Sequence, residues 1–246
     1  MLQSDPTTTD RTPRRAPRVG PVPHPLALGA TVLLYALGIG VGVIATSLGA
    51  RHTGELRLDR TIAAHRDTPL ADLGRIINVV LGPAVGPLLL LVLCLVLWRT
   101  LGRVVALRAG ALTLGGWLSI EVFKMLFHRH RPPTSVVHAL VVETQPDSFP
   151  SGHTAFTASL VAGLFLALIG HRTLRKVTLL VGLPLVVVVA GSRLVVGAHY
   201  LADVVAAPLL AWGTIAIAVA LGFGERDSAT FLPQWWHRLV TRRAAR

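Results

Sequence analysis

Charged residues and cysteine are scarce in this 246-residue sequence. Asp, Glu, Lys and Arg make up only 15% of it, against about 25% in soluble domains. Together with a hydrophobic content of 52%, this scarcity argues against a soluble globular enzyme and against an intrinsically disordered chain. The single cysteine, Cys94, excludes an intrachain disulfide, so cysteine usage does not indicate the redox compartment.

Acidic residues are half as numerous as basic ones, with 12 Asp and Glu against 24 Lys and Arg, which gives a formal net charge of +12. In a soluble protein this excess would suggest nucleic-acid binding. Here the basic residues lie mostly between long apolar runs, and the aromatic residues do not alternate with them as in a single-strand binder. We therefore interpret the excess as the positive-inside pattern of a membrane protein and expect no nucleic-acid partner.

Six apolar runs are each close to the ~20 residues that an α-helix needs to cross a bilayer. They cover residues 26–50, 77–98, 103–123, 154–170, 177–197 and 204–224. The first run is too long for the core of a signal peptide. The sequence thus predicts an all-α, polytopic membrane protein with six transmembrane helices in one domain, 26–224. A disordered basic tail (1–25) and a second basic tail (225–246) flank that domain.

The connection between the first two runs, residues 51–75, is polar and of mixed charge. Spaced apolar residues such as Leu58 and Leu73 favour an amphipathic helix on the membrane surface. A solvated loop fits the same residues equally well, so both interpretations stay open.

The distribution of basic residues predicts an orientation. With the N-terminus inside, fifteen of the 24 Lys and Arg residues fall on the cytoplasmic side and nine on the outer side. The positive-inside rule then places both termini in the cytoplasm. We expect an integral protein of the plasma (inner) membrane.

Polar residues interrupt the apolar pattern in three clusters. These are residues 124–132 at the end of the third run, 150–153 at the start of the fourth, and Ser192, Arg193, His199 and Asp203 between the fifth and sixth. Because successive spans alternate in direction, all three clusters are expected on the extracytoplasmic face. Ionisable groups at membrane depth are energetically costly, which favours a functional site there.

The first chemical feature of these clusters is an excess of cations. Lys124, Arg131 and Arg193 have no matching set of carboxylates, and three fixed cations favour a multiply charged anion such as phosphate. Ser151 and Gly152 stand before a helix, where backbone N–H groups can point at phosphate oxygens. The cations alone could instead be snorkelling residues, and Ser151 with Gly152 alone could be an ordinary helix start.

The second feature is a pair of histidines with different surroundings. His199 and Asp203 are four residues apart, so an aspartate on the same helical face could fix the imidazole tautomer and leave the other nitrogen as a nucleophile. His153 could then protonate the leaving oxygen. His128 and His130 have no nearby carboxylate or cysteine set, so we expect no metal site.

One carboxylate is expected to lie next to the cations. Glu121 lies one helical turn before Lys124 and is expected to brace that lysine from behind.

The spacing inside the three clusters resembles the signature of the type-2 phosphatidic acid phosphatase superfamily, K-x6-R-P, P-S-G-H and S-R-x5-H-x3-D. The matching residues are Lys124, Arg131 and Pro132, then Pro150, Ser151, Gly152 and His153, then Ser192, Arg193, His199 and Asp203. The signature extends over about 80 residues. The resemblance implies an acid phosphatase/haloperoxidase-like helical bundle that acts on lipid mono- or diphosphates without a metal or other cofactor.

The resemblance also implies a role for each matched residue. His199 attacks phosphorus to form a phosphohistidine, Asp203 orients it, and His153 protonates the leaving group. The residues expected to hold the phosphate oxygens are Lys124, Arg131, Ser151, Gly152 and Arg193. Phosphatidate, phosphatidylglycerophosphate, a polyprenyl diphosphate such as undecaprenyl diphosphate, and a sphingoid phosphate all remain open as substrates, and so does the oligomeric state.

Three alternatives compete with hydrolysis. A lipid phosphotransferase on the same scaffold would pass the phosphoryl group to an acceptor other than water. A vanadate-dependent haloperoxidase would share the anion site, but those relatives are soluble. A transporter or structural membrane protein would not need His199 at all.

Overall fold

The described chain is built from helices. The computed structural model describes residues 25–223, so the expected tails 1–25 and 225–246 lie outside it apart from Pro25. Within this range no strand occurs, only an isolated bridge between His130 and Asp147. The helices are α1 (Pro25–His52), α2 (Glu55–His65), α3 (Thr68–Val80), α4 (Val85–Leu101), α5 (Arg103–Phe127), α6 (Thr134–Val137), α7 (Gly152–Ala167), α8 (Arg172–Val195) and α9 (Leu201–Ala220). The all-α prediction is confirmed for these residues.

Several of the helices are suited to a membrane. Between residues 25 and 223, α1, α5, α8 and α9 are long and apolar enough to cross one, and α3 with α4 adds a fifth candidate if the bent pair is counted as one span. The remaining apolar helix, α7, has 16 residues, fewer than the ~20 that a full crossing needs. This part of the chain is an integral membrane protein with four or five candidate spans, and the expected count of six is not confirmed.

The short helix α7 lies inside the bundle. Ten of its 16 residues are buried, and it packs against α5, α8 and α9. Two of its hydroxyl groups bond locally: Thr154 Oγ1 donates to Ser151 Oγ at 3.1 Å, and Thr157 Oγ1 donates to the carbonyl oxygen of His153 at 3.0 Å. Because protein rather than lipid surrounds most of α7, the helix can carry polar residues along its length.

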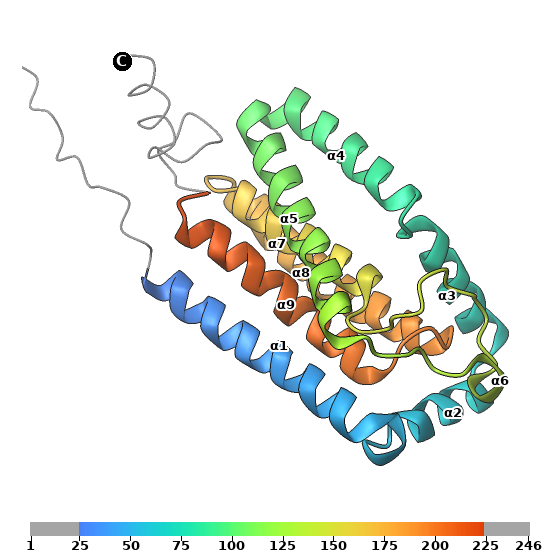
Figure 1. Ribbon diagram of the computed structural model, residues 1–246. Coiled ribbons are helices and arrows are strands. Elements are labelled where there is room, and N and C mark those ends of the chain that lie inside the picture. Colours follow the sequence, from blue (N-terminus) through green and yellow to red (C-terminus); the bar gives the residue numbers. More distant parts are fainter. Residues whose placement is uncertain (1–24, 224–246) are drawn as a thin grey trace, which may run out of the picture.

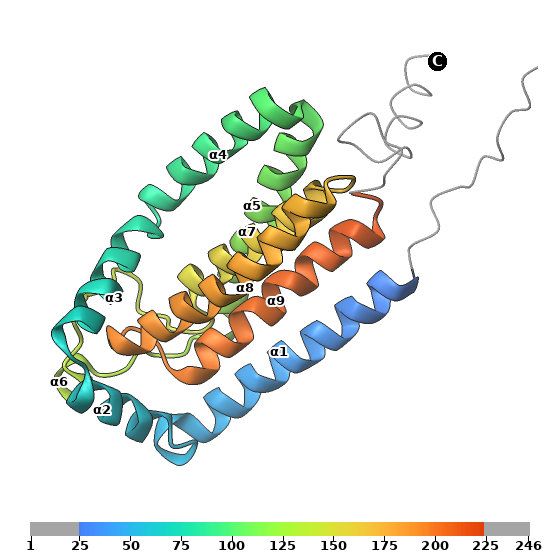
Figure 2. The same ribbon diagram turned by 180° about the vertical axis from the view of Figure 1, so that it is seen from behind.

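The expected span over 77–98 is not one continuous helix. The chain leaves helix after Val80, resumes at Val85, and turns by 66° between α3 and α4. Pro83 lies in the break, and proline both lacks a backbone N–H and clashes with the preceding helical turn. The bend carries α4 away from α9 and allows α3 to pack against α8 (Figure 2).

The connection 51–75 is helical, which favours the first of its two interpretations over a loop. It contains α2 and the start of α3. Asp67 caps α3 by accepting a hydrogen bond from Leu70 N at 2.9 Å. Together with α6, α2 closes one end of the bundle (Figure 1).

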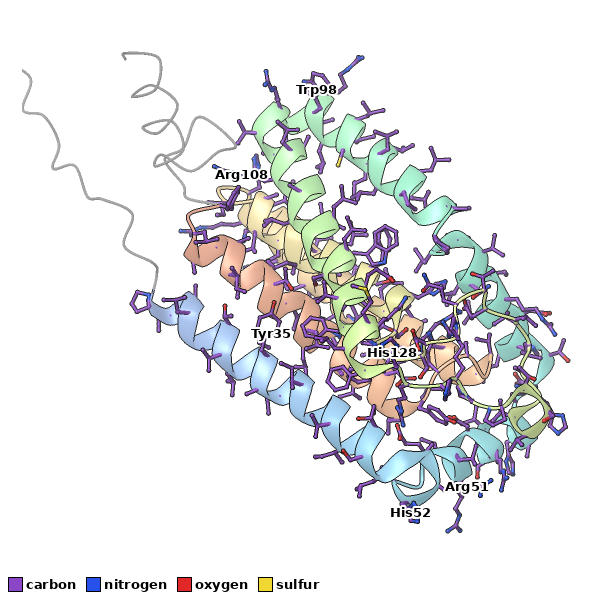
Figure 3. The ribbon with its side chains drawn as sticks, in the orientation of Figure 1. Tyr35, Arg51, His52, Trp98, Arg108 and His128 are labelled. Atoms are coloured by element: carbon purple, nitrogen blue, oxygen red, sulfur yellow. The ribbon has the colours of Figure 1, made fainter. Side chains whose placement is uncertain are left out.

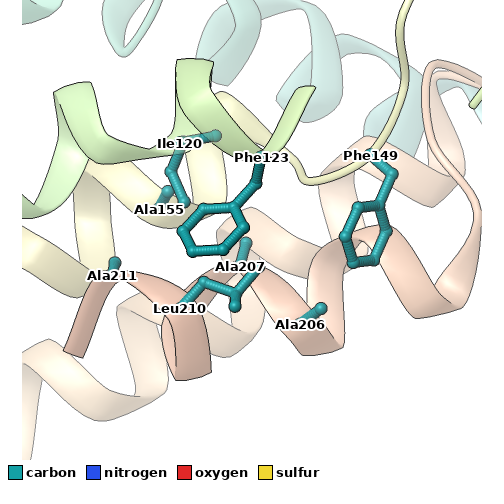
Figure 4. Packing of buried hydrophobic residues seen from close by; sticks show 8 residues of the cluster. All are labelled: Ile120, Phe123, Phe149, Ala155, Ala206, Ala207, Leu210 and Ala211. Atoms are coloured by element: carbon teal, nitrogen blue, oxygen red, sulfur yellow. The ribbon is translucent and has the colours of Figure 1, made fainter. Parts of the chain in front are cut away.

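The largest buried cluster joins α5, α7 and α9, with α1 packed along α9 (Figure 4). Small residues such as Ala207 and Ala211 on α9 allow close helix approach, as is common between helices in membranes. On α1, a Cβ added at Gly38 would meet Leu210 Cδ2 at 2.7 Å, so a larger residue there would force the Leu210 side chain to shift. The two aromatic residues of this cluster, Phe123 and Phe149, directly precede Lys124 and Pro150 in the chain.

The bundle has two distinct ends. The C-terminal ends of α5 and α8 and the N-terminal ends of α7 and α9 meet at one of them (Figure 1). Arg51, His52 and His128 lie at this same end, whereas Trp98 and Arg108 lie at the other (Figure 3). The end that holds His128 also holds the three polar clusters.

Candidate active site

A cavity of about 270 Å³ lies at this end of the bundle. Of the eight expected site residues, five line it, namely Lys124, Arg131, Gly152, His153 and His199. The other three, Ser151, Arg193 and Asp203, are fully buried next to these residues and do not line the cavity. Glu121, Glu143 and Gln145 also contribute to the lining.

His199 lies between α8 and α9 and is 2% exposed. Its Nε2 atom is 3.2 Å from Arg131 Nη1, and its Nδ1 atom is 3.5 Å from Asp203 Oδ2. Since a guanidinium can only donate, Nε2 is the acceptor, and the ring proton belongs on Nδ1, facing Asp203. Burial is the main cause that lowers the pKa of His199, and it keeps the imidazole in the neutral form that can act as a nucleophile.

Asp203 is held at the start of α9 by two short hydrogen bonds. Its Oδ2 accepts from Tyr200 N at 2.8 Å, and its Oδ1 accepts from Arg129 Nη1 at 2.6 Å. The Nδ1 atom of His199 has no partner within hydrogen-bonding geometry, although Asp203 is the carboxylate beside it. Asp203 therefore caps its own helix and faces His199 at the same time.

His153 stands in the first turn of α7 and lines the same cavity as His199. Its Nε2 atom is 3.2 Å from the carbonyl oxygen of Asn78. A protonated Nε2 can donate to that carbonyl, which leaves Nδ1 as the nitrogen with a free lone pair. The two histidines thus come from different helix ends and have different partners.

Arg193 is fully buried near the end of α8, and residues of α3 hold its guanidinium by hydrogen bonds. It donates to Asn78 Oδ1 at 2.6 Å and to the carbonyl oxygen of Gly74 at 3.1 Å. Glu143 Oε1 is 3.8 Å from Arg193 Nη1. Sequence reasoning missed Asn78, although it is the only asparagine in the chain and stands inside an apolar run.

Lys124 has the partner that its spacing predicts. Its Nζ atom donates to Glu121 Oε1 at 2.9 Å and to Gln145 Oε1 at 2.7 Å. The carbonyl oxygen of Gln145 also accepts from Arg131 Nε at 2.7 Å. Gln145 therefore contacts both cations, and sequence reasoning missed it because its loop has no periodic pattern.

Ser151 is bonded within the protein. Its backbone N–H donates to the carbonyl oxygen of Asp203 at 3.0 Å, and its hydroxyl accepts from Thr154 Oγ1 at 3.1 Å. Gly152 lines the cavity, and a Cβ added there would lie 3.9 Å from Lys124 Nζ. Of this expected pair, Gly152 is the residue placed to meet a ligand in the cavity.

Both cations and carboxylates surround the cavity, so the expectation of cations without matching carboxylates does not hold: Glu121 pairs with Lys124, and Glu143 lies 3.8 Å from Arg193. Within residues 25–223, no three His, Cys, Asp or Glu side chains gather in a way that could hold a metal. Lys124, Arg131 and Arg193 surround the histidines, and Lys124 and Arg131 each offer donors to the cavity. Cationic donors of this kind complement phosphate oxygens.

Fold and site together define a helical membrane protein whose cavity carries two histidines and is lined by the cations Lys124 and Arg131 and by the carboxylates Glu121 and Glu143. The chain belongs to the PAP2 superfamily, because the family model matches residues 104–227, which is half of the sequence. This membership confirms the family resemblance. The matched segment includes all three polar clusters.

Curated relatives match a shorter segment. Phosphatidylglycerophosphatase B of Escherichia coli (strain K12) is 42% identical over 74 residues, which are 30% of this chain and 28% of that protein. The protein of the same name from Haemophilus influenzae is 40% identical over 83 residues, 32% of this chain and 34% of that protein. The match spans about a third of the length of these curated relatives.

A solved structure matches most of the fold. It is the crystal structure of a transmembrane PAP2 type phosphatidylglycerolphosphate phosphatase from Bacillus subtilis, and the TM-score is 0.66. The likeness covers 81% of this chain and 98% of the other, at 20% sequence identity. At that identity the comparison shows a shared fold.

Proposed function

We propose that this chain is a phosphatase that hydrolyses the phosphate ester of a membrane lipid at this cavity. The observation that carries the proposal is the setting of His199. One of its nitrogens faces a carboxylate 3.5 Å away and the other lies beside the cationic lining of the cavity. An imidazole in this setting has a fixed tautomer and a nitrogen available for attack.

In the proposed reaction, His199 Nε2 attacks phosphorus, and a P–N bond forms as the P–O bond to the lipid breaks. His153 enters this step as the imidazolium, with Nε2–H on the carbonyl of Asn78 and a second proton on Nδ1, and it gives the Nδ1 proton to the departing lipid oxygen. It then takes a proton from water as that water attacks the phosphohistidine, which releases inorganic phosphate and neutral His199. Lys124, Arg131 and Arg193 stabilise the negative charge that develops on the phosphoryl oxygens.

The names of the relatives support a particular first substrate. The bacterial proteins that this chain resembles are phosphatidylglycerophosphatases. Phosphatidylglycerophosphate is therefore the first lipid to test, ahead of phosphatidate, undecaprenyl diphosphate and a sphingoid phosphate. The apolar helices support a lipid substrate, since its chains can stay in the bilayer while the head group enters the cavity.

The test is release of inorganic phosphate by the purified protein in detergent, over these lipids and in the presence of a chelator. We expect release that survives the chelator and falls by at least about 1,000-fold in His199→Ala, because the reaction then has no nucleophile. Phosphoryl transfer to a second lipid without phosphate release would favour a phosphotransferase. Full activity of a folded His199→Ala protein would contradict the proposal.

A further inference from the structure

A second group of charged side chains lies next to the cavity without lining it. Arg129 stands between two carboxylates, with Nη1 at 2.6 Å from Asp203 Oδ1 and Nη2 bonded to Glu55 Oε2. All three side chains are at least nine-tenths buried. Arg129 occupies a variable position of the K-x6-R-P pattern, so neither the pattern nor the proposed reaction gives it a task.

Arg129 determines how the carboxylate of Asp203 is turned. A carboxylate held by one donor on each oxygen has little rotational freedom, and the donors here are Arg129 on Oδ1 and Tyr200 N on Oδ2. The oxygen that faces His199 Nδ1 is Oδ2, at 3.5 Å. Loss of the bond at Oδ1 would free the carboxylate to rotate away from the imidazole.

Glu55 in turn holds Arg129 and the helix that carries Asp203. Its Oε1 accepts from Ala202 N, in the first turn of α9, at 2.8 Å, and its Oε2 accepts from Thr53 Oγ1 at 2.7 Å. A carboxylate also interacts favourably with the N-terminus of a helix. The guanidinium of Arg129 lies over the ring of Tyr200, 4.5 Å from its centre, which further limits its movement.

We infer that Arg129 and Glu55 are positioning residues that hold Asp203 toward His199 and so connect α2 to the nucleophile. The inference rests on the proposed function. It assigns a task to α2, which lies outside the segment matched by the family model. Neither residue lines the cavity, so their effect falls on the chemical step and leaves substrate binding in place.

The charges around His199 give the inference a signature in the pH profile. Asp203 faces it from α9, Arg193 from α8, Arg131 from the loop after α5, and His153 from α7. Protonated His199 cannot attack, so the acidic limb of the kcat/KM profile reports its protonation. If Arg129 and Glu55 position Asp203, removing either one lets this carboxylate turn away from His199. The protonated ring then loses its neighbouring anion, which moves the acidic limb to lower pH.

The experiment measures kcat, KM, inhibition by inorganic phosphate and the pH profile for Arg129→Gln, Arg129→Lys and Glu55→Gln. For Arg129→Gln we expect kcat to fall by about 10- to 100-fold, by analogy with the loss on removing a residue that orients a metal-binding side chain. The KM and the phosphate inhibition constant should change by less than about threefold. Arg129→Lys should recover part of the lost kcat, because an ammonium restores the charge without the two-sided contact.

Two exposed residues on the neighbouring helices provide matched controls. Arg57→Gln on α2 removes a positive charge, as Arg129→Gln does, and Asp72→Asn on α3 removes a negative charge, as Glu55→Gln does. Neither Arg57 nor Asp72 touches the cavity or Asp203. Both should match the wild-type protein in kcat and in pH profile. Size-exclusion chromatography and a melting temperature in detergent establish that each variant is folded.

Each result decides the inference. Wild-type kcat in a folded Arg129→Gln protein overturns it, and so does a raised KM with intact kcat, since that result would make Arg129 a substrate-binding residue. If Arg129→Gln does not fold, Glu55→Gln decides: a lower kcat with the acidic limb at lower pH supports positioning, and wild-type behaviour contradicts it. A wild-type protein that hydrolyses no lipid phosphate overturns the proposed function as well, whereas an active wild type with unaffected variants overturns positioning alone.

Discussion

Asp59 is a buried acid whose carboxylate has no hydrogen-bond partner. Burial is the main cause that raises its pKa to about 7; the charges of Glu55 and Asp203 add to the rise, and Arg129 opposes it. The folded protein therefore holds this proton to a higher pH than the unfolded chain, where the pKa of an aspartate is about 3.9. The stability that this proton contributes is fully present below about pH 4 and is lost as the pH rises toward about 7.

Asp59→Asn imitates the protonated acid and removes this dependence. We expect the variant to melt above the wild-type protein at pH 8, by several degrees, since ~1 kcal/mol corresponds to about 2–4 °C in a chain of this size. The difference should shrink as the pH falls toward 5. Melting temperatures in detergent across this range test the prediction, with the exposed Asp72→Asn as control. A difference that does not change with pH would contradict it.

His153 carries a second prediction at the level of one residue. If it protonates the leaving lipid oxygen, His153→Ala should slow poor leaving groups far more than good ones, by about 100- to 10,000-fold against a few-fold. Aryl phosphates of graded leaving-group pKa, used as soluble substrates, measure this slope. Equal losses across the series would remove His153 from the acid role and leave only its contact with the carbonyl of Asn78.

Some residues of the site could be predicted from the sequence and others could not. The three clusters were recognisable because Lys124, Arg193 and His199 interrupt apolar runs at fixed spacings, and charge in such a run is conspicuous. Gln145 and Arg129 lie in a polar loop, where one more polar residue carries no signal. Their importance depends on which atoms they meet after folding.

At the scale of elements, the sequence did not predict that α3 contributes to the site. The run 77–98 reads as one span because every residue in it is uncharged, and the break at residues 81–84 shows only as a glycine and a proline. Proline is frequent inside membrane helices, so its presence alone does not predict a break. The bend allows α3 to reach Arg193, a contact that no local pattern specifies.

Asn78→Ala tests this contribution of α3. The change removes the acceptor that lies 2.6 Å from Arg193 Nη1 and leaves a fully buried guanidinium with fewer partners. Hydrogen bonds to charged groups contribute about 1.5–3 kcal/mol. We therefore expect inhibition by inorganic phosphate to weaken by about 10- to 100-fold, because Arg193 is no longer held near the cavity. Val79→Ala, on the exposed side of the same helix, is the control and should leave inhibition unchanged.

In the molecule as a whole, the alternating direction of successive helices decides which distant segments lie together. Helices that run in opposite directions bring the end of α5, the start of α7, the end of α8 and the start of α9 to one end of the bundle, and alternation of spans in the sequence predicts this grouping. The same argument could not reveal that α2 folds over that end and bonds to α9 through Glu55. The apolar spacing of segment 51–75 favours a helix, but it does not specify which part of the bundle that helix packs against.

The orientation of the bundle in the membrane gives the last prediction. The excess of Lys and Arg predicts that the end with Arg51 lies outside and the end with Arg99 inside the cell. Both arginines are exposed, and Arg99 directly follows Trp98, which lies at the end opposite Arg51 (Figure 3). Arg51→Cys and Arg99→Cys, each in a Cys94→Ser background, are therefore matched probes at the two ends. In sealed right-side-out vesicles, a membrane-impermeant maleimide should label Arg51→Cys at once and Arg99→Cys only after permeabilisation. The reverse pattern would put the cavity on the cytoplasmic face, where its lipid phosphates would come from the inner leaflet. Phosphate release by Cys94→Ser alone verifies that the background keeps the native fold.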